Sequence, residues 1–174
     1  MPRTLSISNQ LLSIRGRMEI TDESGQPVYE ARGSFALIRP TWRIRKASRQ
    51  VATVRRQIVS WTSTWKIQSE LGNFSIRRKL LSWRPHYKTR GGPFDGAVLQ
   101  ANIWDLKFTV SYRESLMARA AGSLLTLRDR QTIEVLPDGD APELFVVIAM
   151  VALHLDHRDE KRRRKRAENK KDDL

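Results

Sequence analysis

Cations gather at three places in the middle of the sequence, and phosphate binding is the chemistry that suits them. The three groups are Arg43, Arg45 and Lys46, then Arg55 and Arg56, then Arg77, Arg78 and Lys79. Arginine offers a forked donor that matches phosphate oxygens, and lysine adds a compact charge. Side chains alternate along a strand, so Arg43 and Arg45 share one face, as do Arg77 and Lys79. Because cations avoid an apolar interior, we expect these groups to face outward and form a basic patch where their strands are neighbours.

Three tryptophans, Trp61, Trp65 and Trp83, lie in the same part of the chain. Aromatic rings beside cations suit a membrane interface, and they also suit stacking on the bases of single-stranded nucleic acid. The alternative is a solvated outer surface whose cations bind nothing, with the tryptophans filling a core.

A second cationic feature stands near the end of the chain, where six cations are consecutive. They are Lys161, Arg162, Arg163, Arg164, Lys165 and Arg166. Residues 158–174 are too charged to fold alone, so we expect a frayed helix extension or a disordered tail. The tail would contact anionic lipid, contact nucleic acid phosphates or act as a nuclear address. The alternative is a solubilising tail that complements the C-terminus of a preceding helix.

No residue pattern indicates catalysis, a cofactor or a metal. The chain has no cysteine, which excludes thiolate chemistry, disulfides and cysteine-bound zinc. His154 and His157 are three residues apart, and His86 is distant in sequence; no further ligand is evident, so we expect no metal site. Phosphate-binding glycine loops and a G-x-S-x-G nucleophile are missing. We therefore expect a protein that is not an enzyme and that needs no cofactor.

The overall charge points to acidic partners. The chain of 174 residues has a formal net charge of +13, with 32 Lys and Arg against 19 Asp and Glu. Such a balance favours nucleic acid or an anionic membrane surface. The first residues lack the long apolar segment of a signal peptide. We expect a cytoplasmic protein, with a peripheral position at a membrane.

The element that must organise these residues is an unbroken apolar run at 144–153. It has no polar face, so a helix here must be enclosed on all sides. Crossing a bilayer takes about 20 apolar residues, which makes this run a core helix, expected over 142–157, and not a transmembrane segment. Some ten to twelve short strands precede it, including a hairpin around Gly25 and a run at 124–127. We predict a mainly β fold, a closed antiparallel barrel of about twelve strands around the C-terminal helix.

The predicted barrel spans residues 18–157, between a lead-in at 1–17 and the basic tail at 158–174. Within it, Asp22, Gly25, Val28 and Tyr29 form a D-x-x-G-x-x-V-Y motif. A G-x-x-x-x-A-x-I-x-D stretch follows at 96–105, and the apolar helix ends at 153–156 with Leu-His-Leu-Asp. In this order the motifs resemble the LURP-one-related family, whose neighbours are the phospholipid scramblase and Tubby C-terminal domains.

The resemblance implies a twelve-stranded barrel threaded by its C-terminal helix. Tubby-type domains are associated with phosphoinositide head groups, and scramblases with phospholipids and calcium. This chain lacks the cysteine-rich segment, the proline-rich N-terminus and the calcium loop of scramblases, so lipid scrambling does not carry over. We expect a non-catalytic module that binds acidic phospholipid head groups or an anionic membrane surface. Nucleic-acid binding through the same cations, or a structural or regulatory role with a protein partner, remains the alternative.

Overall fold

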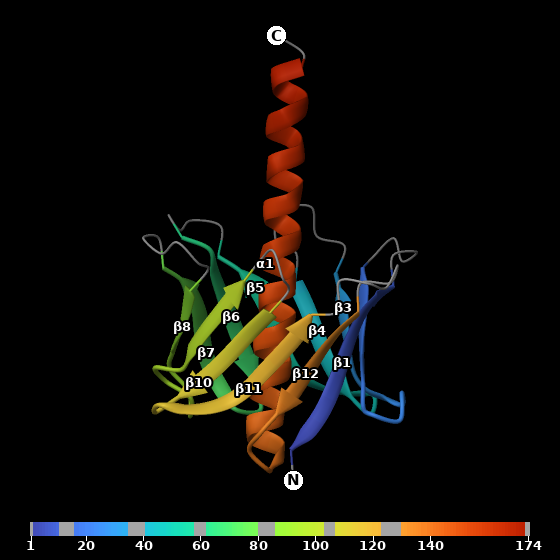
Figure 1. Cartoon of the computed structure of the whole chain (residues 1–174), viewed down its shortest axis with the longest axis vertical. Coiled ribbons are helices and arrows are strands. Elements are labelled where there is room, and N and C mark those ends of the chain that lie inside the picture. Colours follow the sequence, from blue (N-terminus) through green and yellow to red (C-terminus); the bar gives the residue numbers. More distant parts are fainter. Residues whose placement is uncertain are drawn as a thin grey trace.

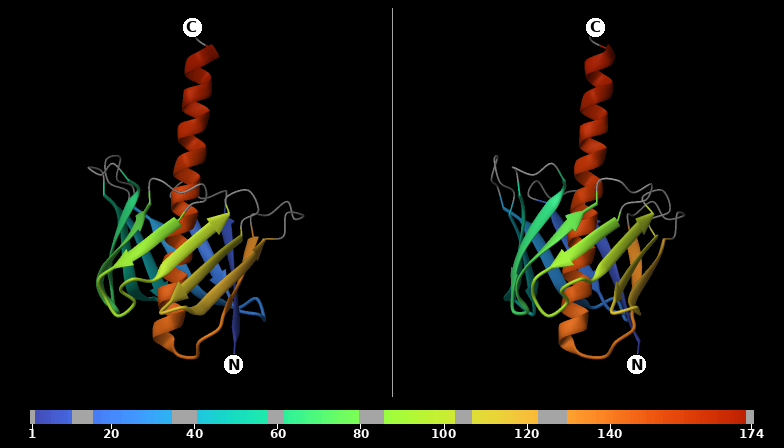
Figure 2. Two further views of the ribbon diagram at one scale, coloured as in Figure 1. Left: turned by 60° about the vertical axis from the view of Figure 1, so that its left-hand side comes forward. Right: turned by 90° about the vertical axis from the view of Figure 1, so that its left-hand side faces the viewer.

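The chain folds into a closed β-barrel with one long helix along its axis (Figure 1). The computed structural model describes residues 2–10, 16–34, 41–57, 62–79, 86–102, 107–122 and 130–172. Two further views agree that the helix runs through the middle of the strands (Figure 2). The predicted fold class, a mainly β barrel enclosing a C-terminal helix, is confirmed.

Twelve strands and one helix make up the described residues. The strands are β1 Arg3–Gln10, β2 Arg17–Thr21, β3 Pro27–Gly33, β4 Thr41–Lys46, β5 Arg49–Arg56, β6 Thr64–Ser69, β7 Gly72–Arg78, β8 His86–Arg90, β9 Val98–Asn102, β10 Lys107–Tyr112, β11 Ser115–Gly122 and β12 Arg130–Val135. The helix α1 spans Asp140–Asp172. Each strand pairs antiparallel with its neighbours in sequence, and β1 pairs with both β2 and β12, which closes the barrel. The strand expected at 124–127 lies outside the described residues.

Strand β1 corrects the expectation that residues 1–17 are a lead-in outside the barrel. Leu5 and Ile7 are fully buried and face inward, while Ser6 and Ser8 between and beyond them are partly exposed. Without β1, the edges of β2 and β12 would present unpaired backbone groups. The first strand is therefore needed for closure.

The hairpin between β2 and β3 shows how the D-x-x-G motif forms its turn. The Asp22 carboxylate accepts hydrogen bonds from the backbone N–H groups of Ser24 at 3.0 Å and Gln26 at 2.9 Å. Gly25 has a φ of +81°, which glycine adopts without steric cost. The hydrogen bond from the Ser24 hydroxyl, followed by the Gln26 backbone N–H, lowers the pKa of Asp22. The motif is thus explained by turn geometry.

The apolar run lies inside the barrel, as its composition predicts. Val147 is 0% exposed and Met150 is 1% exposed, and every residue at 144–153 is buried. Inward-facing strand side chains such as Ile20, Ile44 and Ile76 belong to the same core. This part of the helix needs no polar side because the barrel surrounds it.

Helix α1 is longer than the expected 142–157. It begins at Asp140, with Pro142 in its first turn, a position that proline tolerates. It continues to Asp172, so the basic segment is a helix extension, one of the two alternatives that its composition left open. Arginine, lysine and glutamate are good helix formers, which favours continuation beyond the barrel.

Candidate anion-binding face

The cations predicted from the sequence separate into an outer set and a set directed toward α1. The outer set is exposed, and within the described part of the chain its members have no carboxylate partner; it comprises Arg43, Arg45, Arg55, Arg77 and Lys79. The Arg77 Nε donates a hydrogen bond to the Thr62 hydroxyl at 3.0 Å. These residues stand on β4, β5 and β7 and immediately after β7.

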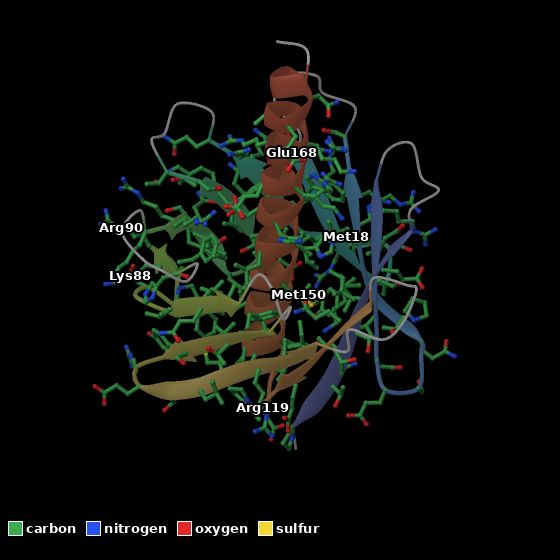
Figure 3. All side chains as sticks on the ribbon, turned by 45° about the horizontal axis from the view of Figure 1, so that its top comes forward. Met18, Lys88, Arg90, Arg119, Met150 and Glu168 are labelled. Carbon is green, nitrogen blue, oxygen red and sulfur yellow. The ribbon has the colours of Figure 1, made fainter. Side chains whose placement is uncertain are left out.

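Strand register places further cations beside the outer set. Arg55 on β5 is directly opposite Lys66 on β6, Lys66 is opposite Ser75 on β7, and Ser75 is opposite Arg90 on β8. With strands about 4.8 Å apart, this row crosses roughly 14 Å of the wall. Lys88 is opposite Arg77, and both Lys88 and Arg90 project outward from β8 (Figure 3).

A second row runs beside the first and carries neutral donors and acceptors. Thr53 on β5 is opposite Gln68 on β6, and Gln68 is opposite Asn73 on β7. The two rows enclose a surface pocket of about 420 Å³. Its lining residues are Thr53, Arg55, Lys66, Ile67, Gln68, Asn73, Phe74, Ser75 and Arg90, none of which is acidic. The pocket therefore offers three cations flanked by hydroxyl and amide groups.

In two places on this wall, like-charged residues lie directly opposite each other on neighbouring strands. The pairs are Arg55 with Lys66 and Arg77 with Lys88. Like charges directly opposite one another destabilise a sheet by roughly 0.2–1 kcal/mol per pair. On the opposite side of the barrel, Arg119 forms an ion pair with Glu134 at 2.6 Å. Around the pocket, none of these four cations has a carboxylate partner among the described residues, and a bound anion would reduce their repulsion.

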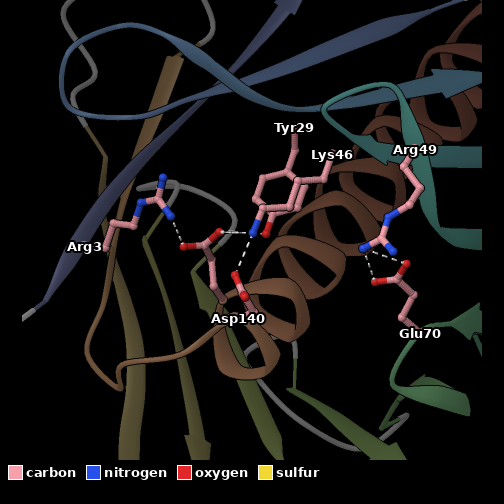
Figure 4. Close-up of polar contacts among 7 residues, drawn as sticks. Arg3, Tyr29, Lys46, Arg49, Glu70 and Asp140 are labelled. Carbon is pink, nitrogen blue, oxygen red and sulfur yellow. Dashed lines mark hydrogen bonds and ion pairs between the residues drawn. The ribbon is translucent and has the colours of Figure 1, made fainter.

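Lys46 is not part of the outer wall, although the sequence suggested that it was. Its ammonium group pairs with Asp140 at 2.7 Å and with Glu143 at 3.5 Å, both in the first turn of α1 (Figure 4). Glu143 also accepts hydrogen bonds from Tyr29, at 2.6 Å, and from Arg3. Lys46 therefore neutralises carboxylates at the N-terminal end of the helix.

Arg56 and Arg78 likewise pair with carboxylates of the helix, so they do not belong to the outer set. Arg56 pairs with Asp159 at 2.7 Å. Arg78 pairs with Glu160 and lies 3.6 Å from Asp156. Consecutive residues of a strand point to opposite faces of the sheet. In Arg55-Arg56 and Arg77-Arg78 the first arginine faces outward, and the second is therefore directed toward the helix.

The terminal cations lie on the part of α1 that projects beyond the strands (Figure 1). Lys161, Arg162, Arg163 and Lys165 are exposed. The side chains of Arg164 and Arg166 lie outside the described residues.

Two readings of the tryptophans were open, a surface site beside the cations and a place in the core. Trp65 is 2% exposed and belongs to the core, as does Trp42 at 3%. Trp61 and Trp83 lie outside the described residues. Trp65 thus fits the alternative reading, in which aromatic rings fill the barrel.

Sequence reasoning missed Lys66, Lys88 and Arg90. None of them stands directly beside another cation in the sequence, unlike Arg45 and Lys46, Arg55 and Arg56, or Arg77 and Arg78. The alternating pattern could have indicated Lys66, because it stands between the apolar residues Trp65 and Ile67 and side chains alternate along a strand. The structure buries both neighbours, and Lys66 faces outward.

Among the described residues, no group of three or more potential ligands converges to hold a metal ion. His86 lies on β8, whereas His154 and His157 lie on α1. Burial, followed by the charge of Lys79, lowers the pKa of His86, which keeps its imidazole neutral near pH 7. No described helix has an apolar stretch of the length that spanning a membrane demands.

Comparison with known proteins identifies a family for this chain. No curated protein and no solved structure matches the chain significantly. The family model of LURP-one-related proteins matches residues 3–154, from the start of β1 to the buried part of α1. This range covers most of the sequence and all twelve strands, so the chain belongs to the LURP-one-related family.

Proposed function

We propose that this barrel is a non-catalytic binding module for acidic phospholipid head groups, which it contacts through the wall formed by β5 to β8. The observation that carries the proposal is the row Arg55, Lys66 and Arg90 over a pocket without a carboxylate. Charge-assisted hydrogen bonds from arginine to phosphate oxygens are short and directional. The neighbouring hydroxyl and amide groups would bind the uncharged part of a head group.

The dimensions of the pocket support a small ligand group. Its volume of about 420 Å³ lies within the roughly 300–1,000 Å³ range of small-molecule sites. The outer cations Arg43, Arg45 and Arg77 stand around it and would add attraction to an anionic surface, about 1 kcal/mol for each cation near the membrane. The protein would then sit at the membrane periphery, with the pocket side toward the lipid.

The buried carboxylates support a structural and not a catalytic role. Glu143 and Asp156, both on α1, are 5% and 2% exposed. Each accepts a hydrogen bond from a tyrosine at 2.6 Å, Glu143 from Tyr29 and Asp156 from Tyr87. They are held inside the barrel, away from the pocket on its outer wall.

Vesicle sedimentation tests the proposal. We expect the protein to sediment with vesicles that contain about 30% anionic lipid and to stay in solution with neutral vesicles. The double variant Arg55→Ala/Lys66→Ala should bind the anionic vesicles at least tenfold more weakly, because it removes two cations from the pocket.

The matched control is Arg49→Ala/Arg119→Ala, which removes the same charge outside the pocket. Both residues are exposed and paired, Arg49 with Glu70 and Arg119 with Glu134. If control and pocket variants lose the same affinity, the interaction depends on net charge alone and the pocket is not the site. An oligonucleotide can be added as a competitor at a phosphate concentration equal to that of the anionic lipid. If it releases the protein from the vesicles, nucleic acid is favoured as the ligand of the pocket.

A further inference from the structure

Helix α1 leaves the barrel through a set of contacts that we name the collar. The collar joins Arg158, Asp159 and Glu160 of the helix to Trp42 on β4, Arg56 on β5 and Arg78 on β7. The Arg158 guanidinium lies 4.9 Å from the centre of the Trp42 ring, and the Arg56–Asp159 pair measures 2.7 Å. Contacts with three strands fix the direction in which the helix emerges.

Beyond the collar the helix carries a large excess of positive charge. Residues 161–172, which we name the arm, contain eight Lys or Arg against two acidic residues, a net charge of +6. The two carboxylates before the arm, Asp159 and Glu160, are occupied by Arg56 and Arg78. The arm charge is therefore not neutralised by the collar.

The cations of the arm point in several directions around its axis. Successive residues of an α-helix are about 100° apart, so Lys161, Arg162 and Arg163 span more than half of the circumference. All three are exposed. A helix that lies on a membrane needs an apolar face, and the arm has only Ala167 to offer. A flat surface would contact one side of the arm and leave the other cations unused.

A groove lined by phosphates on two sides fits this distribution better. The major groove of B-DNA is about 12 Å wide and admits an α-helix, whose diameter with side chains is about 10–12 Å. Twelve residues extend about 18 Å, which is enough to follow the groove past several phosphates on both strands. In A-form RNA the major groove is deep and narrow.

We propose that the arm binds double-stranded DNA, without sequence preference, by entering the major groove and contacting phosphates on both of its sides. This activity is separate from the lipid pocket, because the arm lies at the end of the barrel and the pocket lies on its wall. It also lies outside the residues that the family model matches.

Fluorescence anisotropy with a 20-base-pair DNA duplex at several salt concentrations tests the proposal. The variant Lys161→Ala/Arg162→Ala/Arg163→Ala/Lys165→Ala keeps good helix formers in the arm. Four lost phosphate contacts should reduce the slope of log affinity against log salt by about 3.6. Between 50 and 200 mM salt, the affinity of the unmodified protein should then fall about 100-fold more than that of the variant.

Two comparisons separate this proposal from the lipid pocket. Arg55→Ala/Lys66→Ala should keep its DNA affinity within about twofold, since it leaves the arm unchanged. Duplex RNA of the same sequence should bind about tenfold more weakly than DNA. An unchanged salt slope in the four-alanine variant would overturn the proposal. The proposal would also be overturned if the four-alanine variant lost vesicle binding but kept its DNA binding. Equal affinity for RNA would overturn the assignment to the major groove.

A collar variant tests whether the direction of the arm matters. Asp159→Asn makes the protein more positive but removes the partner of Arg56. A fixed arm predicts severalfold weaker DNA binding in this variant. Tighter binding would mean that the arm acts as a loose polycation, which contradicts entry into a groove.

Discussion

At the scale of single residues, two tyrosines connect the barrel to charged groups on its central helix. Tyr29 donates a hydrogen bond to Glu143 and Tyr87 donates one to Asp156, each at 2.6 Å. Burial raises the pKa of both phenols, aided by Glu143 for Tyr29 and by Asp156 for Tyr87. These hydrogen bonds need the neutral phenol, so the fold depends on both tyrosines keeping their protons.

This dependence predicts a loss of stability at alkaline pH. A tyrosine in the unfolded chain loses its proton near pH 10, while the folded protein retains it. The stabilisation is therefore complete below pH 10 and falls as pH rises above it, by about 1.4 kcal/mol per pH unit for each tyrosine. Urea unfolding measured between pH 9 and 11 would show this decline.

Substitution identifies the groups responsible. Tyr87→Phe should remove about half of the decline, although the protein becomes less stable at every pH. Tyr112→Phe is the control, because the Tyr112 hydroxyl is bonded to the Pro93 carbonyl on the surface. A free energy of unfolding that is the same at pH 9 and pH 11 would refute the assignment.

At the scale of elements, the strands and the helix could be predicted because burial determines where apolar residues occur in the sequence. A barrel wall has an inside and an outside, so apolar residues recur at every second position, as in Trp42 and Ile44 or Ile133 and Val135. The enclosed helix shows as an unbroken apolar run. The sequence did not place β1 in the barrel, because only Leu5 and Ile7 mark its inner face.

The candidate site was predicted only in part, for a reason that also follows from alternation. Arg55 faces outward as predicted, but Arg56 next to it must face the other way. The sequence alone did not show that the partner of Arg56 is Asp159, which follows it by more than 100 residues. Pairing between distant residues depends on barrel closure, which no local pattern contains.

The central helix should be the most sensitive element of the fold. Ile148→Ala removes a fully buried side chain and should lower the free energy of unfolding by about 2–5 kcal/mol. Leu116→Ala, at an exposed position, should change it by about 0.5 kcal/mol or less. Chemical denaturation would measure both, and equal effects would contradict a helix packed on all sides.

At the scale of the whole molecule, the barrel wall differs from one side to the other. Around the pocket, strands β5 to β8 carry the cations Arg55, Lys66 and Arg90, which have no carboxylate partner among the described residues. Strand β12 lies six strands away from β6 around the closed barrel. On the β12 side, Ser6 and Thr132 share a hydrogen bond at 3.3 Å, and Arg119 is paired with Glu134. The positive charge without a carboxylate partner is therefore greater on the β5–β8 side of the barrel than on the β12 side. Such an uneven distribution suits a protein that docks on an anionic surface.

The absence of cysteine allows this direction to be measured with a single label. A fluorophore on Gln68→Cys would stand at the pocket on β6, and one on Thr132→Cys would stand on the opposite side of the barrel. Both positions are exposed. On anionic vesicles that carry a quencher on the lipid, we expect strong quenching at position 68 and little at position 132. Equal quenching at both positions, or stronger quenching at 132, would contradict binding through the β5–β8 wall.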